Sequence, residues 1–178
     1  MTTELAAAAA AEEAAREIIL RRLSRSPQTH SQLREATLRK GIDKDAIDSV
    51  LTRLTEVGLV DDIAYAATFL ASYRNRPGSS RSWMQRRLIE KGVERELALE
   101  TVSAITEEDE LASAVALLRR KGTAPEQDQR SRQRNYARLA RRGYRSSTIA
   151  AALDATSVGD LPESELIELD HAAGREVE

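Results

Sequence analysis

Residues 89–93 read IEKGV, and related pentapeptides stand on either side of them, LRKGI at 38–42 and ARRGY at 140–144. The glycines of the three stretches, at positions 41, 92 and 143, are 51 residues apart both times. Glycine after a basic residue is typical of a helix end, because glycine adopts the left-handed C′ conformation and a cation complements the negative end of the helix dipole. The sequence therefore predicts three helices that end at these glycines.

The same period recurs on the N-terminal side of each glycine. Thr29, Ser80 and Ser131 each stand 12 residues before a glycine, and a hydroxyl there can accept a hydrogen bond from a free amide of the first helical turn. Thr29 and Gln32 also have the spacing of a capping box. We therefore expect a helix to begin after each hydroxyl. The core candidates of these three helices are Thr37, Leu88 and Leu139, with Leu38, Ile89 and Ala140 beside them.

A second helix is predicted after each glycine and a third before each hydroxyl. Apolar pairs at a four-residue step predict the second: Ile47 and Leu51, Ala98 and Val102, Ile149 and Leu153. The third is expected at 14–23, 62–73 and 108–120, with a loop change at 122–126 where the last repeat leaves the register. Three short helices per unit resemble a helix-turn-helix domain. The predicted fold class is all-α, an elongated tandem array of three three-helix (helix-turn-helix-like) repeats.

The predicted segments follow from this register. They are an Ala-rich N-terminal extension at 1–13, repeats at 14–60, 61–106 and 107–155, and an acidic C-terminal tail at 156–178. Both ends are expected to be disordered or frayed.

Composition excludes several classes of protein. The chain has 178 residues, of which only 3% are aromatic, and Ala, Leu, Arg and Glu dominate, so a β-rich fold is poorly supported. Cysteine is absent, which removes disulfides, thiolate zinc sites and cysteine nucleophiles. The longest uncharged apolar run, 5–11, is too short to span a bilayer. We therefore expect a cytoplasmic protein that does not enter membranes.

Sequence motifs of catalysis are missing. No G-x-x-x-x-G-K-[ST] or G-x-G-x-x-G stretch is present, and His30 and His171 are the only histidines. The acidic clusters at 61–62 and 107–110 begin predicted helices, where carboxylates cap and complement the dipole, so they are interpreted as structural. We expect no enzymatic activity, no cofactor and no metal site.

Charge is distributed unevenly along the chain. Residues 72–146 hold 17 basic and 10 acidic groups, a balance of +7, whereas residues 147–178 hold 1 and 8, a balance of −7. Arginine outnumbers lysine 23 to 4, and guanidinium groups bind phosphates and carboxylates in a bidentate way. The basic middle thus favours an anionic partner, although solvated helix faces would give a similar pattern. Trp83 beside it could stack on a base but is better interpreted as packing.

Two groups of basic residues are the candidates for such an interface. The first surrounds Pro77-Gly78 and the helix after it, and the second includes one predicted face of the last repeat's middle helix. The candidates are Arg74, Arg76, Arg81, Arg86, Arg87 and Lys91 in the second repeat, and Arg120, Lys121, Arg134, Arg138, Arg141, Arg142 and Arg145 in the third.

Over residues 14–154 the chain resembles the RecX regulatory proteins of bacteria, modulators of the RecA recombinase. The resemblance rests on the order and spacing of several motifs taken together. They are SQLR at 31–34, LRKG at 38–41, LTEVGLVDD at 54–62, RRLIEKGV at 86–93, EEDELASAVALLRRK at 107–121 and LARRGY at 139–144. The alanine-rich head and the acidic tail depart from the family pattern, so neither inherits a function from it.

The resemblance implies a curved array of three-helix repeats without enzymatic activity, lying in the groove of the RecA–DNA filament. Such proteins typically suppress ATP hydrolysis, strand exchange and stimulated repressor cleavage, and so act in homologous recombination, DNA repair and the SOS response. It also implies that the candidate basic residues contact RecA or DNA.

Other interpretations stay open. The first is a direct DNA-binding protein that acts without RecA, since three-helix units with a basic helix can enter a groove. A helical scaffold for another protein is a further alternative, and a metal-dependent enzyme is the least favoured. We expect a monomer.

Overall fold

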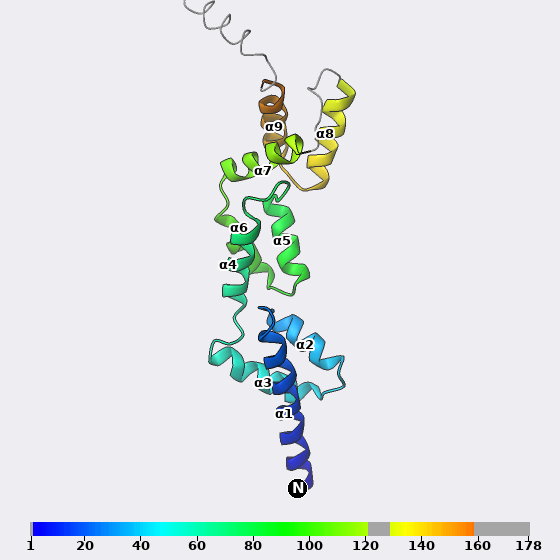
Figure 1. The fold of residues 1–178 in the computed structure, drawn as a ribbon, viewed down its shortest axis with the longest axis vertical. Helices are drawn as coiled ribbons and strands as arrows, with labels where there is room; N and C mark the ends of the chain where they lie inside the picture. The colour runs from blue at the N-terminus through cyan, green and yellow to red at the C-terminus, as the bar shows by residue number, and fades with distance from the viewer. Residues whose placement is uncertain (1, 121–128, 159–178) are drawn as a thin grey trace, which may run out of the picture. The chain divides into compact units, whose positions relative to one another are not determined.

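The computed structural model describes residues 2–120 and 129–158, and within them it is all α-helical (Figure 1). The first helices are α1 (Thr2–Leu23), α2 (His30–Leu38) and α3 (Lys44–Glu56). They are followed by α4 (Asp62–Tyr73), α5 (Arg81–Glu90) and α6 (Arg95–Ser103), and then by α7 (Glu107–Arg119), α8 (Gln129–Arg141) and α9 (Ser146–Val158). The all-α prediction is thereby confirmed, whereas the elongated arrangement of the repeats stays a prediction.

Two compact units divide the described chain, and each is treated by itself below. Unit 1 comprises the residues up to Ser72 together with Met84–Ala104, and unit 2 comprises Tyr73–Trp83 together with the described residues from Ile105 onward. No helix in the described ranges is long and apolar enough to cross a membrane.

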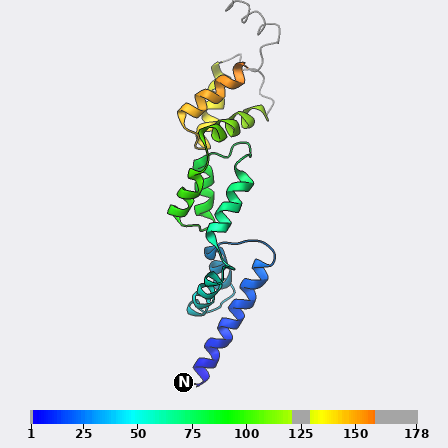
Figure 2. The ribbon, with the colours of Figure 1, turned by 90° about the vertical axis from the view of Figure 1, so that its left-hand side faces the viewer.

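The core of unit 1 forms where α1, α2 and α3 pack on one another (Figure 2). Ile47 and Leu51, predicted as one stripe of a helix, are completely buried on α3. The remaining buried residues of this cluster are Ala15, Ile19, Leu33, Val50, Leu54 and Val60. On the surface of the unit, Arg34 of α2 binds Asp48 of α3 in a bidentate way, at 2.7 and 3.2 Å.

The core of unit 2 lies where α7 and α8 pack on α9. The predicted pair Ile149 and Leu153 is buried there, together with Leu139 of α8. The other buried members of the cluster are Ala114, Leu117, Leu118, Tyr144 and Ala152. Burying side chains of this size contributes about 1.5–3 kcal/mol each, which makes these stripes the main source of stability.

The helix ends confirm the predicted glycines. Gly41, Gly92 and Gly143 have φ values of +77°, +86° and +83°, a conformation that other residues adopt only with strain. Thr29 caps α2 through a capping box with Gln32, as predicted. The hydroxyl of Ser80 likewise accepts the backbone N–H of Trp83 at 3.0 Å, at the start of α5.

The two hydroxyl caps also bind a distant carbonyl, and this defines two junctions. In the first junction (Thr29, His30, Ser31, Asp62, Lys91 and Gly92), Thr29 Oγ1 donates to the carbonyl of Lys91 at 2.5 Å. In the second (Ser80, Arg81, Ser82, Glu110, Arg142 and Gly143), Ser80 Oγ donates to the carbonyl of Arg142 at 2.5 Å. Both bonds join residues 62 positions apart.

Each junction has two further contacts in common. The amide after the cap donates to a carboxylate, His30 to Asp62 at 2.8 Å and Arg81 to Glu110 at 2.9 Å. The next residue, a serine in both cases, lies against the glycine of the same junction, where a Cβ would overlap Ser31 or come within 2.8 Å of Ser82 Cβ. The first junction lies wholly in unit 1 and the second in unit 2.

The third predicted cap is wrong. Ser131 lies inside α8, which extends back to Gln129, and its hydroxyl accepts a bond from the guanidinium of Arg134 at 2.7 Å. Gln129 and Arg130 are good helix formers, so the helix continues through the position that the repeat assigned to a cap.

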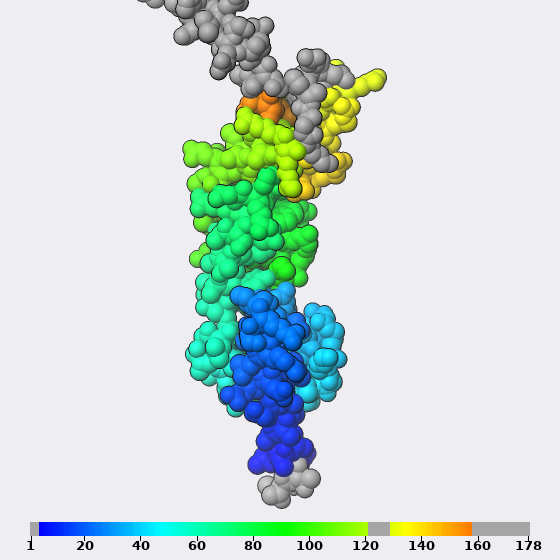
Figure 3. All heavy atoms as spheres, viewed as in Figure 1, coloured from blue at the N-terminus to red at the C-terminus, as the bar shows by residue number. Residues whose placement is uncertain are grey.

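The expected fraying of the N-terminal head is also wrong, because α1 begins at Thr2. Alanine has the highest helix propensity, and Glu12 fastens this part of α1 to α3 by accepting from Ser49 Oγ at 2.8 Å and from Arg53. Figure 3 shows the N-terminal part of α1 projecting from the packed helices of unit 1. The acidic tail lies mostly outside the described residues.

The neighbours of the predicted core positions face the solvent. Thr37, Leu88 and Leu139 are completely buried, but Leu38 and Ile89 are 37% and 36% exposed, and Ala140 is exposed as well. A helix turns by about 100° per residue, so adjacent positions do not share a face.

Candidate functional site

The candidate basic residues are divided between the two units. Arg86, Arg87 and Lys91 lie in unit 1. Unit 2 holds Arg74, Arg76, Arg81, Arg120, Arg134, Arg138, Arg141, Arg142 and Arg145. Lys121 lies outside the described residues.

Arg74 forms an ion pair with Asp109 within unit 2. It follows α4 and reaches α7, where its Nε and Nη2 both donate to Asp109 Oδ2, at 3.1 and 2.7 Å. Asp109 in turn forms the capping box of α7 with Thr106. The Arg74 guanidinium, aided by the Thr106 amide, lowers the pKa of Asp109 to about 2. The Arg74–Asp109 pair therefore fixes the start of the α4–α5 connection to α7.

Three other candidate arginines also bind within unit 2. Arg81 forms an ion pair with the buried Glu110 at 3.6 Å, where the side chain of Arg81 is only 24% exposed. The guanidinium of Arg142 donates to the carbonyl of Gly78 at 3.1 Å, and that of Arg138 to the carbonyl of Leu117 at 3.2 Å. The guanidinium groups of these three arginines are therefore bound to acceptors of their own unit.

The side chain of Ser113 on α7 makes several contacts with the segment 76–79. Its Oγ accepts the amides of Gly78 and Ser79 at 3.1 and 3.0 Å, and lies 2.8 Å from the carbonyl of Arg76. The same oxygen lies 2.9 Å from the hydroxyl of Tyr144. Burial raises the pKa of Tyr144 to about 12. These hydrogen bonds tie the connection before α5 to α7.

A second set of candidates is exposed. Arg76 lies 4.3 Å from the ring centroid of Tyr73, a cation–π contact. Trp83 is half-buried, and its ring centroid is 5.4 Å from that of Tyr73. These contacts favour a packing role for Trp83 over stacking on a base. Arg120, Arg141 and Arg145 are exposed and form no ion pair within the described part of unit 2.

Only some side chains of the predicted arginine face of α8 are exposed to solvent. α8 ends at Arg141, so Arg142 and Arg145 belong to the turn that leads into α9. Arg134, Arg141 and Arg145 are exposed, whereas Arg138 and Arg142 are half-buried. The reason is that the carbonyls of Leu117 and Gly78 lie within reach of the two inner guanidinium groups.

In unit 1 the candidates lie on and after α5. Arg86 and Arg87 are exposed, and Arg87 forms an ion pair with Glu90 at 2.9 Å. Lys91 is half-buried, and its backbone carbonyl is the acceptor of the first junction.

Carboxylates of both acidic clusters cap helices, as predicted, Asp61 at α4 and Asp109 at α7. Asp61 Oδ1 accepts the amide of Ala64 at 2.9 Å, at the start of α4, and Asp62 and Glu110 serve the two junctions. No group of three or more potential metal-ligating side chains occurs among the described residues.

The junction bonds are the contacts that sequence reasoning missed. The 51-residue repeat predicts the caps and the glycines, but it does not by itself indicate a bond from the cap of one repeat to the carbonyl before the glycine of the next repeat. A signal existed, because Thr29 and Lys91 recur as Ser80 and Arg142 at one period.

The Arg74–Asp109 pair predicts a pH dependence of stability. The pKa of Asp109 is about 2 in the folded chain and about 3.9 in an unfolded one. Its stabilising contribution is therefore complete above pH 5 or so and is lost as the pH falls toward 2. We expect Asp109→Asn to lower the free energy of unfolding at neutral pH, and the difference from the wild type to narrow between about pH 5 and 2. Urea unfolding followed by circular dichroism at stepped pH measures this difference.

A Glu108→Gln variant, altered on the same first turn of α7, controls for the loss of one acidic charge. A difference between wild type and Asp109→Asn that stayed constant down to pH 2 would show that the ion pair does not stabilise the fold.

Known proteins resemble this chain in both structure and sequence. Residues 15–54 match the family model described as RecX, first three-helix domain. The crystal structure of RecX from Lactobacillus salivarius superposes with a TM-score of 0.74 at 16% identity, covering 84% of this chain and 99% of that one. This likeness establishes a shared fold.

Sequence relatives extend the match over most of the chain. The regulatory protein RecX of Mycobacterium ulcerans is 37% identical over 142 residues, which cover 78% of this chain and 82% of the relative. That of Streptomyces coelicolor is 39% identical over 135 residues, covering 74% and 71%, and that of Thermobifida fusca is 33% identical over 164 residues, covering 91% and 86%. With identity at this level over more than two thirds of each relative, the chain belongs to the RecX family of regulatory proteins.

Proposed function

We propose that this chain is a non-enzymatic regulator that binds the RecA–DNA filament and inhibits its ATPase, strand-exchange and coprotease activities. Membership of the RecX family is the observation that carries the proposal. A filament of RecA on DNA displays phosphates and carboxylates, and exposed guanidinium groups are suited to both.

The contacts of the basic residues suggest a division of labour. The proposed filament contacts are Arg76, Arg86, Arg87, Lys91, Arg120, Lys121, Arg134, Arg141 and Arg145. Arg74, Arg81, Arg138 and Arg142 are proposed to support them, since each is bound to an acceptor within unit 2. Removal of a supporting arginine should therefore reduce stability before it reduces binding.

The rate of ATP hydrolysis by the cognate RecA on single-stranded DNA tests the function. We expect inhibition when the protein is added at substoichiometric amounts, because a regulator acting at filament ends or along the groove affects many RecA subunits. No inhibition at any ratio, together with tight duplex binding that weakens steeply with salt, would instead assign the chain to the direct DNA-binding alternative.

Charge reversal at Arg141 and Arg145 tests the surface. Both side chains are exposed and form no ion pair within the described residues, so the double variant Arg141→Glu/Arg145→Glu should fold normally. We expect the concentration for half-inhibition to rise by about tenfold or more, the effect of roughly 1.4 kcal/mol of lost binding energy.

The matched control carries the same change of charge on unit 1. Arg16 and Lys44 are exposed on α1 and α3 and belong to neither candidate group. Arg16→Glu/Lys44→Glu should inhibit like the wild type. Equal inhibition by both double variants would remove Arg141 and Arg145 from the proposed interface.

A further inference from the structure

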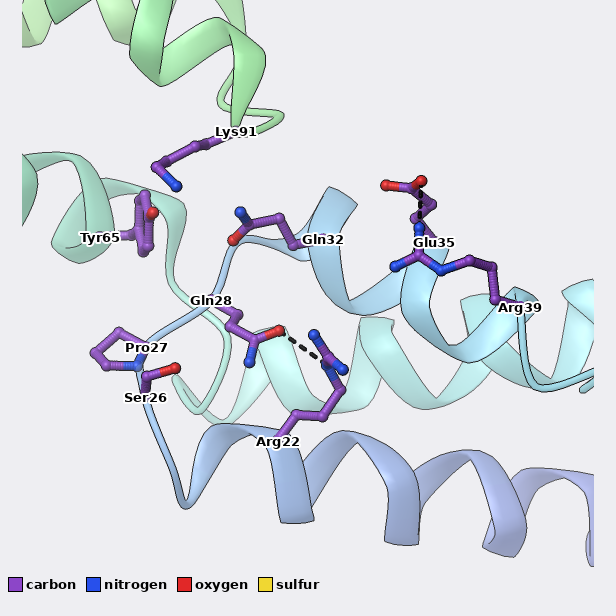
Figure 4. A pocket seen from close by; sticks show the side chains of 9 residues that line it. All are labelled: Arg22, Ser26, Pro27, Gln28, Gln32, Glu35, Arg39, Tyr65 and Lys91. Atoms are coloured by element: carbon purple, nitrogen blue, oxygen red, sulfur yellow. Dashed lines mark hydrogen bonds and ion pairs between the residues drawn. The ribbon is translucent and has the colours of Figure 1, made fainter.

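A polar pocket of about 360 Å³ opens in unit 1 beside the first junction (Figure 4). It lies among the end of α1, the loop to α2, one side of α2, the start of α4 and Lys91. The lining residues that bear on its charge and donors are Arg22, Gln32, Glu35, Arg39, Tyr65 and Lys91. The volume is within the range of pockets that hold small molecules, but the lining is far more polar than usual.

The pocket has an excess of positive charge. Three of its side chains are cationic and one is acidic, and that acid, Glu35, is already paired with Arg39 at 2.6 Å. The ammonium group of Lys91 has no ion-pair partner within the described residues. Charged groups concentrated in this way repel one another unless an anion joins them.

Hydrogen bonds hold two polar side chains of the pocket in place. Arg22 donates through Nε to Gln28 Oε1 at 2.9 Å, which leaves its two terminal amino groups as further donors. Gln32 accepts the amide of Thr29 through Oε1 at 3.2 Å, and its NH₂ group remains as a donor. The pocket therefore presents donors that are positioned before any ligand arrives.

The second junction serves as an internal comparison. Arg142 occupies the repeat position of Lys91, and Gly78 that of Pro27, each 51 residues further on. The Arg142 guanidinium lies over Gly78, donates to its carbonyl at 3.1 Å and would be 2.6 Å from a Cβ there. In unit 2 the protein thus binds this cation itself, whereas the Lys91 ammonium of unit 1 forms no ion pair within the described residues.

We propose that this pocket binds one nucleotide of an unpaired DNA strand. Arg22, Arg39 and Lys91 would neutralise the phosphate, and the half-buried ring of Tyr65 would stack on the base. The choice of DNA rests on the proposed function, but the residues Arg22, Arg39 and Tyr65 lie outside the interface proposed there. The pocket adds a first-repeat contact to that interface.

Binding of a short fluorescein-labelled oligo(dT), followed by anisotropy without RecA, tests the pocket. We expect Tyr65→Leu to weaken binding at least about fivefold, since stacking contributes about 1–3 kcal/mol per base. Tyr65→Phe keeps the ring and should bind like the wild type. Lys91→Ala should weaken binding severalfold and make its salt dependence shallower, because a phosphate contact is lost.

Lys40→Ala is the matched control. Lys40 is exposed, lies beside Arg39 at the end of α2, and does not line the pocket. It should have little effect. Equal weakening by Lys40→Ala and Lys91→Ala, or wild-type binding by Tyr65→Leu, would overturn the proposal. Competition with thymidine monophosphate tests whether the ligand is a free nucleotide or part of a strand. Equal affinity for the mononucleotide and for oligo(dT) would identify a free nucleotide as the ligand and overturn the proposal of a DNA strand.

The RecA ATPase of the same variants separates this proposal from the proposed function. If the wild type inhibits RecA and the pocket variants bind oligo(dT) normally, the pocket proposal fails and the proposed function stands. If oligo(dT) binding depends on Tyr65 and Lys91 while the wild type leaves the ATPase unchanged, the pocket proposal stands and the proposed function fails.

Discussion

Replacing Gly92 with alanine is expected to destabilise unit 1 by roughly 2–5 kcal/mol. Two costs add up. Gly92 has φ +86°, which costs a residue with a Cβ about 1–2 kcal/mol. The new Cβ would also overlap Ser31 Cβ and come within 2.5 Å of its Oγ, and relieving such overlap costs about 1–3 kcal/mol. Because Ser31 Cβ cannot rotate away, the backbones of the first junction must separate.

Comparison with the same substitution at Gly41 isolates the second cost, the steric overlap with Ser31. Gly41 has φ +77°, but a Cβ there would meet no heavy atom within 4 Å. Gly41→Ala should therefore lose only the conformational cost, about 1–2 kcal/mol. Urea unfolding followed by circular dichroism compares the two variants. Equal losses would mean that the packing of Gly92 against Ser31 does not stabilise the molecule.

Replacing Ser113 with alanine is expected to destabilise unit 2 by about 1–3 kcal/mol. The amide of Gly78 would keep its second acceptor, the carbonyl of Ser113, at 3.1 Å. The amide of Ser79 would likewise keep the carbonyl of Arg76, at 3.2 Å. The buried Tyr144 hydroxyl, in contrast, would lose its hydrogen bond to Ser113. A buried polar group left unsatisfied costs about 1–3 kcal/mol.

An exposed serine provides the comparison. Ser103 is exposed and donates to the carbonyl of Glu100 at 2.6 Å, and Ser103→Ala should change the free energy of unfolding by less than about 0.5 kcal/mol. Thermal unfolding by circular dichroism measures both variants. A loss at Ser113 no larger than that at Ser103 would rule out the buried network as a source of stability.

Local features of the fold could be predicted from sequence because they depend on few neighbouring residues. The left-handed glycines need only a residue without a Cβ, and the caps Thr29 and Ser80 need only a hydroxyl before the first turn. Ser131 shows the limit of this reasoning. A hydroxyl in the repeat register does not cap a helix when the preceding residues continue it.

The basic residues show a different limit. Sequence reveals the charge of Arg138 and Arg142 but not which carbonyls lie near them, because Leu117 is 21 positions away and Gly78 is 64. The pocket in unit 1 cannot be recognised from the sequence for a related reason. Residues 1–71 have no excess of positive charge, so nothing in the composition pointed to the local cluster of Arg22, Arg39 and Lys91.

The 62-residue reach of the junction bonds has a consequence for synthesis of the chain. At about 5–20 residues per second, a ribosome makes the carbonyl of Lys91 roughly 3–12 s after the hydroxyl of Thr29. The interval from Ser80 to Arg142 is the same. Each junction is thus completed only after a further stretch of chain has emerged, and the nascent protein acquires its final contacts in order from the N-terminus.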